Sequence, residues 1–302
     1  MSENRDNGVN KSVINWYPGH MAKAMREIKG DLKLIDIVLI ILDARAPYAS
    51  LNKEVYELVK DKTIIMVFNK ADLANITALK NAEAKYKKEG CYVVSTNSIT
   101  GEGINDLISL IKKLGEKIKY ENKTNKQYKE MKHVYRALVV GVPNVGKSSI
   151  INKMSGRKSA EVGNKPGITK KRQWLKVGDS IEIMDTPGLL SKSLKEEGAG
   201  EKLAILGNIK EEILDVEILA HTLINILLSN DWYRAMFMDR YKLDSSIDQM
   251  VEFQILDEIG RKRGCLLKGD IVDSTKAAKI LLEDYRTGKI GKINLEWGNK
   301  WS

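Results

Sequence analysis

The chain has 302 residues and a formal net charge of +10 at pH 7, from 50 Lys and Arg against 40 Asp and Glu. This length allows a substantial core and about two domains, and the basic excess favours an acidic partner such as RNA, although solvated surface charge would give the same balance. Two distant cysteines, Cys91 and Cys265, exclude a disulfide framework and favour a reducing, cytoplasmic setting. The lack of a long apolar stretch predicts a soluble protein without a membrane span.

Short runs of β-branched residues alternate with helical patterns over the first two thirds of the chain, which is typical of strand–helix units in a parallel sheet. The last two runs are separated by "GD" and are expected to pair as an antiparallel hairpin. Six strands are predicted, at Ile37–Leu42, Thr63–Phe68, Tyr92–Ser95, Ala137–Val142, Gln173–Val177 and Ile181–Met184.

Beyond the strands, the pattern divides the chain into three parts. We expect residues 1–15 to be flexible and residues 16–192 to form an α/β domain, with a connecting helix or linker in the charged stretch 113–135. In residues 193–302 the strand pattern gives way to apolar residues at helical spacing, which predicts a smaller all-α domain.

The tetrapeptide "NKAD" (Asn69, Lys70, Ala71, Asp72) follows the second predicted strand, at the end where open α/β sheets bind ligands. GTPases read guanine with this tetrapeptide. The Asp72 carboxylate would accept hydrogen bonds from N1–H and the exocyclic amine of guanine, donors that adenine does not present. Asn69 would tie the base to the phosphate loop, and the stem of Lys70 would cover the ring face.

The next strand is followed by "NSITGEGI", which is similar to the loop whose backbone amide contacts guanine O6 in GTPases. We place this contact at Asn97 and Ser98, with an ordinary loop as the alternative.

The segment "GVPNVGKS", from Gly141 to Ser148, fits the phosphate-loop pattern GxxxxGK[ST] between a strand and a helix. The glycines allow successive N–H groups and the helix N-terminus to face phosphate oxygens. Lys147 would reach the β- and γ-phosphates, and the Ser148 hydroxyl would bind Mg²⁺. The expected phosphate contacts are Asn144, Val145, Gly146, Lys147, Ser148 and Ser149.

Two further fragments complete a GTPase site. Asp185 of "DTPG" would hold Mg²⁺ through water, and the Gly188 amide would contact the γ-phosphate of GTP. Thr169 of "KPGITK" would bind Mg²⁺ in the GTP-bound form. The base-reading segments precede the phosphate loop, which is the ordinary GTPase order rotated as a ring, so the sequence predicts a circularly permuted P-loop GTPase domain.

The chain resembles the circularly permuted ribosome biogenesis GTPase A family. The likeness extends from "NWYPGHMAKA" through "LDARAP" and the nucleotide motifs to "GCLLKGD" and "LLEDYRTGKIGKINLE" near the C-terminus. The resemblance implies a GTP-hydrolysing factor that acts late in maturation of the large ribosomal subunit. It also implies binding to the rRNA of the subunit precursor, in a GTP-dependent manner, by a protein expected to be a monomer.

Hydrolysis raises a difficulty, because Leu189 stands where many GTPases have a water-orienting Gln. We therefore expect slow intrinsic hydrolysis that the ribosomal subunit stimulates. The resemblance points to His20 of "YPGH" for the missing role, with a packing or capping role as the alternative. Asn144 resembles a phosphate-loop Asn that binds K⁺ in some GTPases. Asp43 and Arg45 are expected to fix a loop rather than to catalyse.

Two other functions stay open from the sequence. Leu189 favours a nonenzymatic RNA-binding scaffold with a structural nucleotide, although the intact set of Mg²⁺ residues opposes it. A GTPase acting on tRNA or membranes is disfavoured because no anchor or RNA-modifying set of residues is visible. For the favoured GTPase hypothesis, we expect the DTPG switch to lead from Gly188 directly into the helical domain and to transmit the nucleotide state to it.

Overall fold

The computed structural model describes residues 18–122, 134–156, 173–190, 198–209 and 214–296, with side chains from residue 21 onward. Thr169, the segment expected to be flexible at 1–15 and part of the link that follows Gly188 lie outside the described residues. His20 lies in the first turn of helix α1 (Pro18–Asp31), and only its backbone is described.

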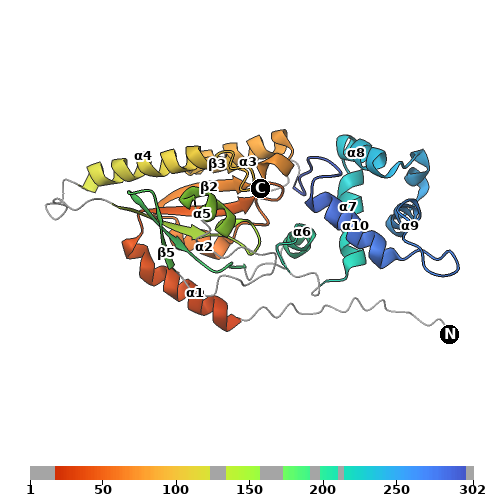
Figure 1. Cartoon of the computed structure of the whole chain (residues 1–302), viewed down its shortest axis with the longest axis horizontal. Coiled ribbons are helices and arrows are strands. Elements are labelled where there is room, and N and C mark those ends of the chain that lie inside the picture. Colours follow the sequence, from red (N-terminus) through yellow and green to blue (C-terminus); the bar gives the residue numbers. More distant parts are fainter. Residues whose placement is uncertain (1–17, 123–133, 157–172, 191–197, 210–213, 297–302) are drawn as a thin grey trace, which may run out of the picture.

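The α/β part is built on one six-stranded sheet with the spatial order β3-β2-β1-β4-β6-β5 (Figure 1). Five strands pair in parallel, and β5 pairs antiparallel with β6, as the hairpin prediction requires. The strands are β1 (Ile37–Asp43), β2 (Thr63–Asn69), β3 (Tyr92–Thr96), β4 (Tyr135–Val140), β5 (Gln173–Val177) and β6 (Ile181–Asp185).

All six predicted strands are confirmed, and the fourth is displaced. It covers Tyr135–Val140 rather than Ala137–Val142, because Gly141 has φ +156° and turns the chain out of the sheet, with its Cα hydrogen facing the Ile41 carbonyl.

The path of the chain through the sheet shows the permutation. The chain builds β1, β2 and β3 outward on one side, returns to β4 beside β1, and then builds β6 and β5 on the other side. Where the strand order reverses between two neighbouring parallel strands, a crevice forms at their carboxyl ends, and open α/β sheets bind ligands there. The loop after β4, which is the predicted phosphate loop, lies at that point.

Helices cover both faces of the sheet. On one face, α1, α2 (Lys53–Val59) and α3 (Ile76–Lys88) pack against alternate side chains of the central strands; on the other, α4 (Ile104–Asn122) and α5 (Lys147–Ser155) do so. Every residue of β1 is buried, as expected for a strand covered on both faces. Of the charged stretch 113–135, the first ten residues extend α4.

The C-terminal part is helical, as predicted, and lies beyond one end of the sheet (Figure 1). Helix α7 contacts α6, α8, α9 and α10, so it is the centre of this part. Asp215, Asn230 and Asp273 cap the starts of α7, α8 and α10 by accepting backbone N–H bonds. The helices are α6 (Ala199–Ile205), α7 (Val216–Leu228), α8 (Asp231–Tyr241), α9 (Glu252–Lys262) and α10 (Ser274–Arg286).

A segment near the C-terminus returns to the loops that follow β1 and β2. The Leu295 amide donates to the Arg45 carbonyl at 2.8 Å, and the Asn294 side chain donates to Ala44 at 2.8 Å and accepts from Asn75 at 2.7 Å. The buried Glu296 carboxylate accepts from the Tyr48 amide at 2.9 Å. The helical part is therefore fastened to the sheet by more than the link that follows Gly188, so the domain boundary near residue 192 stays a prediction.

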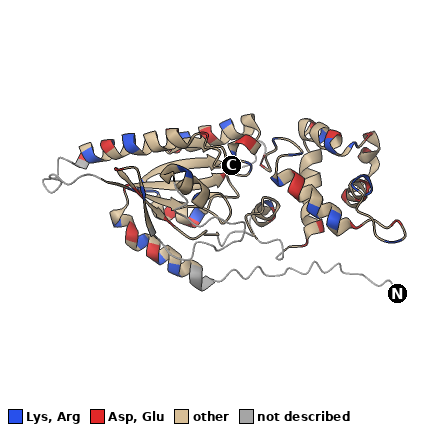
Figure 2. Cartoon of the chain, in the orientation of Figure 1, with Lys and Arg blue, Asp and Glu red and all other residues tan. Residues whose placement is uncertain are grey.

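Charged side chains of both signs are interspersed along the outer helices, and basic residues also occur on α9 and α10 (Figure 2). Within the described ranges, the search for a helix with the length and hydropathy of a membrane span finds none.

Candidate nucleotide-binding site

Asn69, at the end of β2, joins three segments that are far apart in sequence. Its Nδ2 atom donates to the Val145 carbonyl of the phosphate loop at 2.9 Å and to the Ser98 hydroxyl at 3.2 Å. Its Oδ1 atom accepts from the Ser98 amide at 3.1 Å and from the Thr96 hydroxyl at 3.2 Å. One fully buried side chain thus places the base-reading tetrapeptide, the "NSITGEGI" loop and the phosphate loop side by side.

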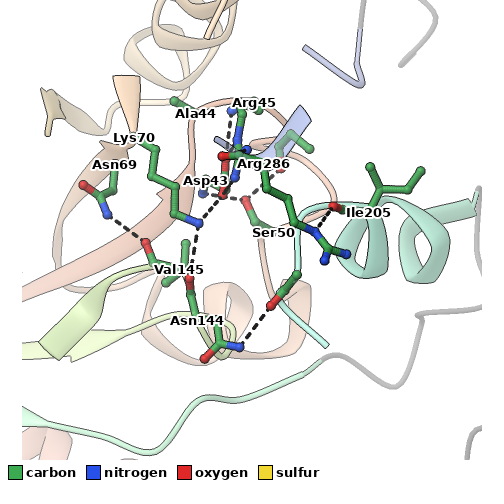
Figure 3. A network of polar contacts seen from close by, with 12 residues as sticks. Asp43, Ala44, Arg45, Ser50, Asn69, Lys70, Asn144, Val145, Ile205 and Arg286 are labelled. Atoms are coloured by element: carbon green, nitrogen blue, oxygen red, sulfur yellow. Dashed lines mark hydrogen bonds and ion pairs between the residues drawn. The ribbon is translucent and has the colours of Figure 1, made fainter. Parts of the chain in front are cut away.

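Lys70, the second residue of the base-reading tetrapeptide, reaches the phosphate loop with its side chain. Its φ is +59°, and its Nζ atom donates to Asp43 at 2.9 Å and to the Asn144 carbonyl at 3.3 Å (Figure 3). Burial lowers the pKa of Lys70, and the Asp43 carboxylate opposes this shift. The partners hold the lysine stem extended across the end of the sheet. Asp72 follows in the 3-10 turn Ala71–Leu73 and is half-buried.

Asp43 and Arg45 of "LDARAP" form a buried ion pair, in which the guanidinium contacts both carboxylate oxygens at 2.9 Å. Burial alone would raise the pKa of Asp43, but the Arg45 and Lys70 cations lower it below its ordinary range. Breaking a buried pair by removing one partner costs about 3–5 kcal/mol. The pair fixes the loop after β1, as expected, and it also holds Lys70.

The "NSITGEGI" loop is a tight turn over the end of β3. The Asn97 side chain accepts from the amides of Ile99 and Thr100, and the Asn97 amide donates to the Glu102 carbonyl at 3.0 Å. The Ser98 amide lies at the base-reading tetrapeptide, where it donates to Asn69 at 3.1 Å. The guanine O6 contact at Asn97 and Ser98 stays a prediction.

The phosphate loop ends where helix α5 begins, at Lys147. Gly146 has φ +104°, and a Cβ atom there would collide with the Asn69 amide nitrogen, so the glycine permits the contact between the two motifs. The Nζ atom of Lys147 donates to the carbonyls of Gly141 at 3.0 Å and Val142 at 2.8 Å. Burial lowers the pKa of Lys147 to about 8, with Asp185 opposing the shift. The first-turn amides of α5, including those of Ser148 and Ser149, form the anion-binding end of a helix.

Two oxygen donors suited to Mg²⁺ meet beside this loop. Asp185 is fully buried at the end of β6, and its Oδ2 atom lies 3.5 Å from the Ser148 hydroxyl. Hydroxyl and carboxylate oxygens are the hard ligands that Mg²⁺ prefers, and Mg²⁺ usually takes only one or two protein ligands beside phosphates. The residues therefore fit the ion. Among the described residues no group of three or more His, Cys, Asp or Glu could hold another metal.

The DTPG segment lies directly against the phosphate loop. A Cβ atom on Gly188 would come within 2.7 Å of the Pro143 backbone, and the Leu189 amide donates to the Gly141 carbonyl at 3.1 Å. Leu189 is buried and apolar, so no polar side chain reaches the γ-phosphate position from there.

Asn144 is in the left-handed region, with φ +53°. Its Nδ2 atom donates to the Gly207 carbonyl, just after α6, at 3.0 Å (Figure 3). The sequence indicated Asn144 but contained no sign of this partner, because the contact joins residues 63 positions apart in chain segments without a shared motif.

Comparisons with known proteins agree with this geometry. The family model described as "50S ribosome-binding GTPase" matches residues 136–251. Ribosome biogenesis GTPase A of Bacillus licheniformis is 38% identical over 94% of this chain and 98% of its own length, and that of Thermotoga maritima is 32% identical over 94% of each. The crystal structure of GNP-bound YlqF from T. maritima superposes with a TM-score of 0.61 at 29% identity, covering 91% of this chain and 97% of that one.

Proposed function

The chain belongs to the ribosome biogenesis GTPase A family, and we propose that it acts late in maturation of the large ribosomal subunit by binding rRNA in a GTP-dependent manner. It is a GTPase and a ribosome assembly factor, with GTP as substrate and Mg²⁺ as cofactor. We further propose that the late maturation step involves contact with rRNA, and that the protein is a monomer located in the cytoplasm.

One observation carries the proposed site. Asn69 bonds to both the phosphate loop and the "NSITGEGI" loop, so the segments that would bind base and phosphates lie at one end of the sheet. This is the arrangement expected when a GTPase domain is permuted without changing its spatial order.

The positions of the described side chains support the roles proposed for Asp72, Lys70, Ser148 and Asp185. The roles proposed for Thr169 and His20 rest on the sequence motifs alone. Asp72 reads the base, Lys70 covers it, and the amides from Asn144 to Ser149 face the phosphates. Ser148 would hold Mg²⁺ directly and Asp185 through water, together with Thr169, which lies outside the described residues. When bound, the ion would supply positive charge that neutralises the phosphate oxygens. The Gly188 amide contacts the γ-phosphate, and His20 orients the attacking water.

The lowered pKa of Lys147 predicts that nucleotide affinity depends on pH. A bound phosphate stabilises the charged ammonium and raises its pKa, so binding above the free pKa of about 8 must take up a proton. Affinity for GDP should therefore fall as pH rises above 8, by up to about tenfold per pH unit.

Calorimetry in buffers of different ionisation enthalpy measures this uptake. It should show a larger proton uptake per GDP at pH 8.5 than at pH 7. The Lys147→Arg variant stays charged at both pH values, so its proton uptake should not differ between them. Lys153→Arg, at an exposed position on the same helix, should show the same difference in proton uptake as wild type. Equal proton uptake by the wild type at both pH values would contradict the assignment.

The GTPase proposal is tested by turnover with and without purified large ribosomal subunits, in K⁺ and in Na⁺. We expect slow hydrolysis alone, stimulation by the subunit, and faster turnover in K⁺, because a cation bound by the Asn144 oxygen would supply charge in place of an arginine finger. Asn144→Ala should reduce turnover in K⁺ about tenfold and leave turnover in Na⁺ unchanged.

The turnover experiment tests the GTPase role and the role of the monovalent cation separately. Turnover that is the same with and without subunits would favour the alternative of an RNA-binding scaffold with a structural nucleotide. Equal turnover in K⁺ and Na⁺ would remove the monovalent cation but leave the GTPase role intact.

A further inference from the structure

A closed ring of polar contacts joins the phosphate loop to the helical part of the chain (Figure 3). Two arms of this ring meet at Asn144. Its side-chain amide donates to the Gly207 carbonyl at 3.0 Å, and its backbone carbonyl accepts from Lys70 at 3.3 Å.

The first arm runs through the loop after β1. Lys70 contacts Asp43 at 2.9 Å, Asp43 is held by the Arg45 guanidinium, and Arg45 donates to the backbone carbonyl of Arg286 at 3.2 Å. The Arg45 guanidinium also lies 5.4 Å from the centre of the Tyr285 ring. This arm uses only the backbone of Arg286.

The second arm uses the side chain of Arg286, at the end of α10. Its guanidinium donates to the carbonyls of Ile205 at 2.8 Å and Ala204 at 2.7 Å, in the last turn of α6. The last carbonyls of a helix have no partner within it and carry partial negative charge. Backbone bonds also hold this turn, from the Gly207 amide to the Ala204 carbonyl at 2.9 Å and from the Asn208 amide to the Leu203 carbonyl at 2.8 Å. The planar, charged guanidinium adds two bonds to carbonyls of the turn that leads into Gly207 and so limits its movement.

The orientation of the Asn144 amide follows from this turn. While Nδ2 donates to the Gly207 carbonyl, the Oδ1 atom lies in the same amide plane, on the other side of Cγ, and points away from Gly207. Oδ1 is the atom that would bind K⁺ in the proposed function, since the NH₂ group has no acceptor capacity for a cation. A displaced Gly207 carbonyl would free the amide to rotate and would lower the fraction of molecules with the oxygen in place.

We propose that Arg286 is a positioning residue for the monovalent cation site, acting through the α6 turn and the Gly207 carbonyl on Asn144. This inference rests on the proposed K⁺ role of Asn144. It makes the cation dependence of GTP hydrolysis a property of the helical part of the chain as well as of the phosphate loop.

Arg286→Met tests the proposal on the full chain. Because the backbone contact with Arg45 remains, the base-reading arm is kept, and GDP affinity in Na⁺ should stay within about twofold of wild type. The K⁺ concentration for half-maximal turnover should rise about tenfold. The rise in melting temperature on replacing Na⁺ with K⁺, measured with a non-hydrolysable GTP analogue, should shrink in parallel.

Two further variants separate positioning from general stability. Arg240→Met removes the contact of Arg240 with the buried Asp284, at 2.8 Å, outside the ring. It should lower the melting temperature without changing the K⁺ requirement. Arg286→Lys keeps the positive charge but lacks the planar guanidinium that bonds to two carbonyls together, so its K⁺ requirement should lie between those of wild type and Arg286→Met.

The failures of the two proposals are distinguishable. Absence of any K⁺ effect in wild type would overturn the cation role of Asn144 and this inference with it. A K⁺ effect that Asn144→Ala abolishes but Arg286→Met leaves at the wild-type requirement would overturn the positioning role alone. If Arg286→Met does not fold, an unchanged K⁺ requirement in Arg286→Lys would likewise overturn the positioning role.

Discussion

Asp72→Asn should change the base preference of the protein from guanine to xanthine nucleotides. In the proposed site the Asp72 carboxylate accepts two hydrogen bonds from guanine, at N1–H and the exocyclic amine, whereas an amide would offer one acceptor and one donor group. The NH₂ group of the introduced asparagine faces the guanine amine, which is also a donor. A hydrogen bond to a charged carboxylate is therefore lost, and two donors face each other instead. We expect GTP and GDP to bind about 100-fold more weakly.

Xanthine carries a carbonyl where guanine carries the amine, so the same substitution creates a matched pair for xanthosine nucleotides. Displacement of a fluorescent nucleotide by GDP and XDP measures both changes in one assay. Asp61→Asn, which makes the same chemical change at an exposed position before β2, is the matched control and should leave the preference unaltered. Retention of the guanine preference by Asp72→Asn would show that "NKAD" does not read the base.

The sheet and the permutation could be predicted because their signals are local. Each strand is a short apolar run, such as Thr63–Asn69, and each motif follows a strand at the carboxyl end. The order of the motifs along the chain was then sufficient to identify the rotation. β4 ends two residues earlier than predicted, because the pattern of apolar residues runs on through Gly141 and Val142 and only the backbone angle of the glycine shows where pairing ends.

The contacts between the sheet and the helical part could not be predicted in the same way. Arg45 belongs to "LDARAP" and Arg286 to the C-terminal motif, but nothing in either segment indicates that they meet, 241 positions apart. The contacts of Arg45 with Arg286, and of Arg286 with the α6 turn, are made to backbone carbonyls. Every residue type supplies a backbone carbonyl, so these contacts leave no pattern in the sequence. The hypothesis that the DTPG link transmits the nucleotide state therefore did not include the hydrogen bond between Asn144 and Gly207, which is a second connection between the sheet and the helical part.

His20→Ala should leave nucleotide binding within about twofold of wild type and reduce subunit-stimulated GTP turnover by about 100-fold, the lower end of what a positioned proton-transfer or water-orienting group contributes. The position after the DTPG glycine is the buried, apolar Leu189, so the water must be oriented from another segment. The backbone of α1 places His20 in the first turn of a helix that starts at Pro18. A neutral imidazole there can accept a proton or hydrogen bond from water near neutral pH.

The matched control is His221→Ala, on α7 in the helical part, where the same side chain is removed from the half-buried surface of another helix. Its stimulated turnover should equal that of wild type. Single-turnover measurements on the subunit complex separate chemistry from association, and the loss in His20→Ala should appear in the chemical step with the affinity for the subunit retained. A reduced subunit affinity with normal chemistry would instead assign His20 to docking, because the residue would then act before the γ-phosphate is attacked.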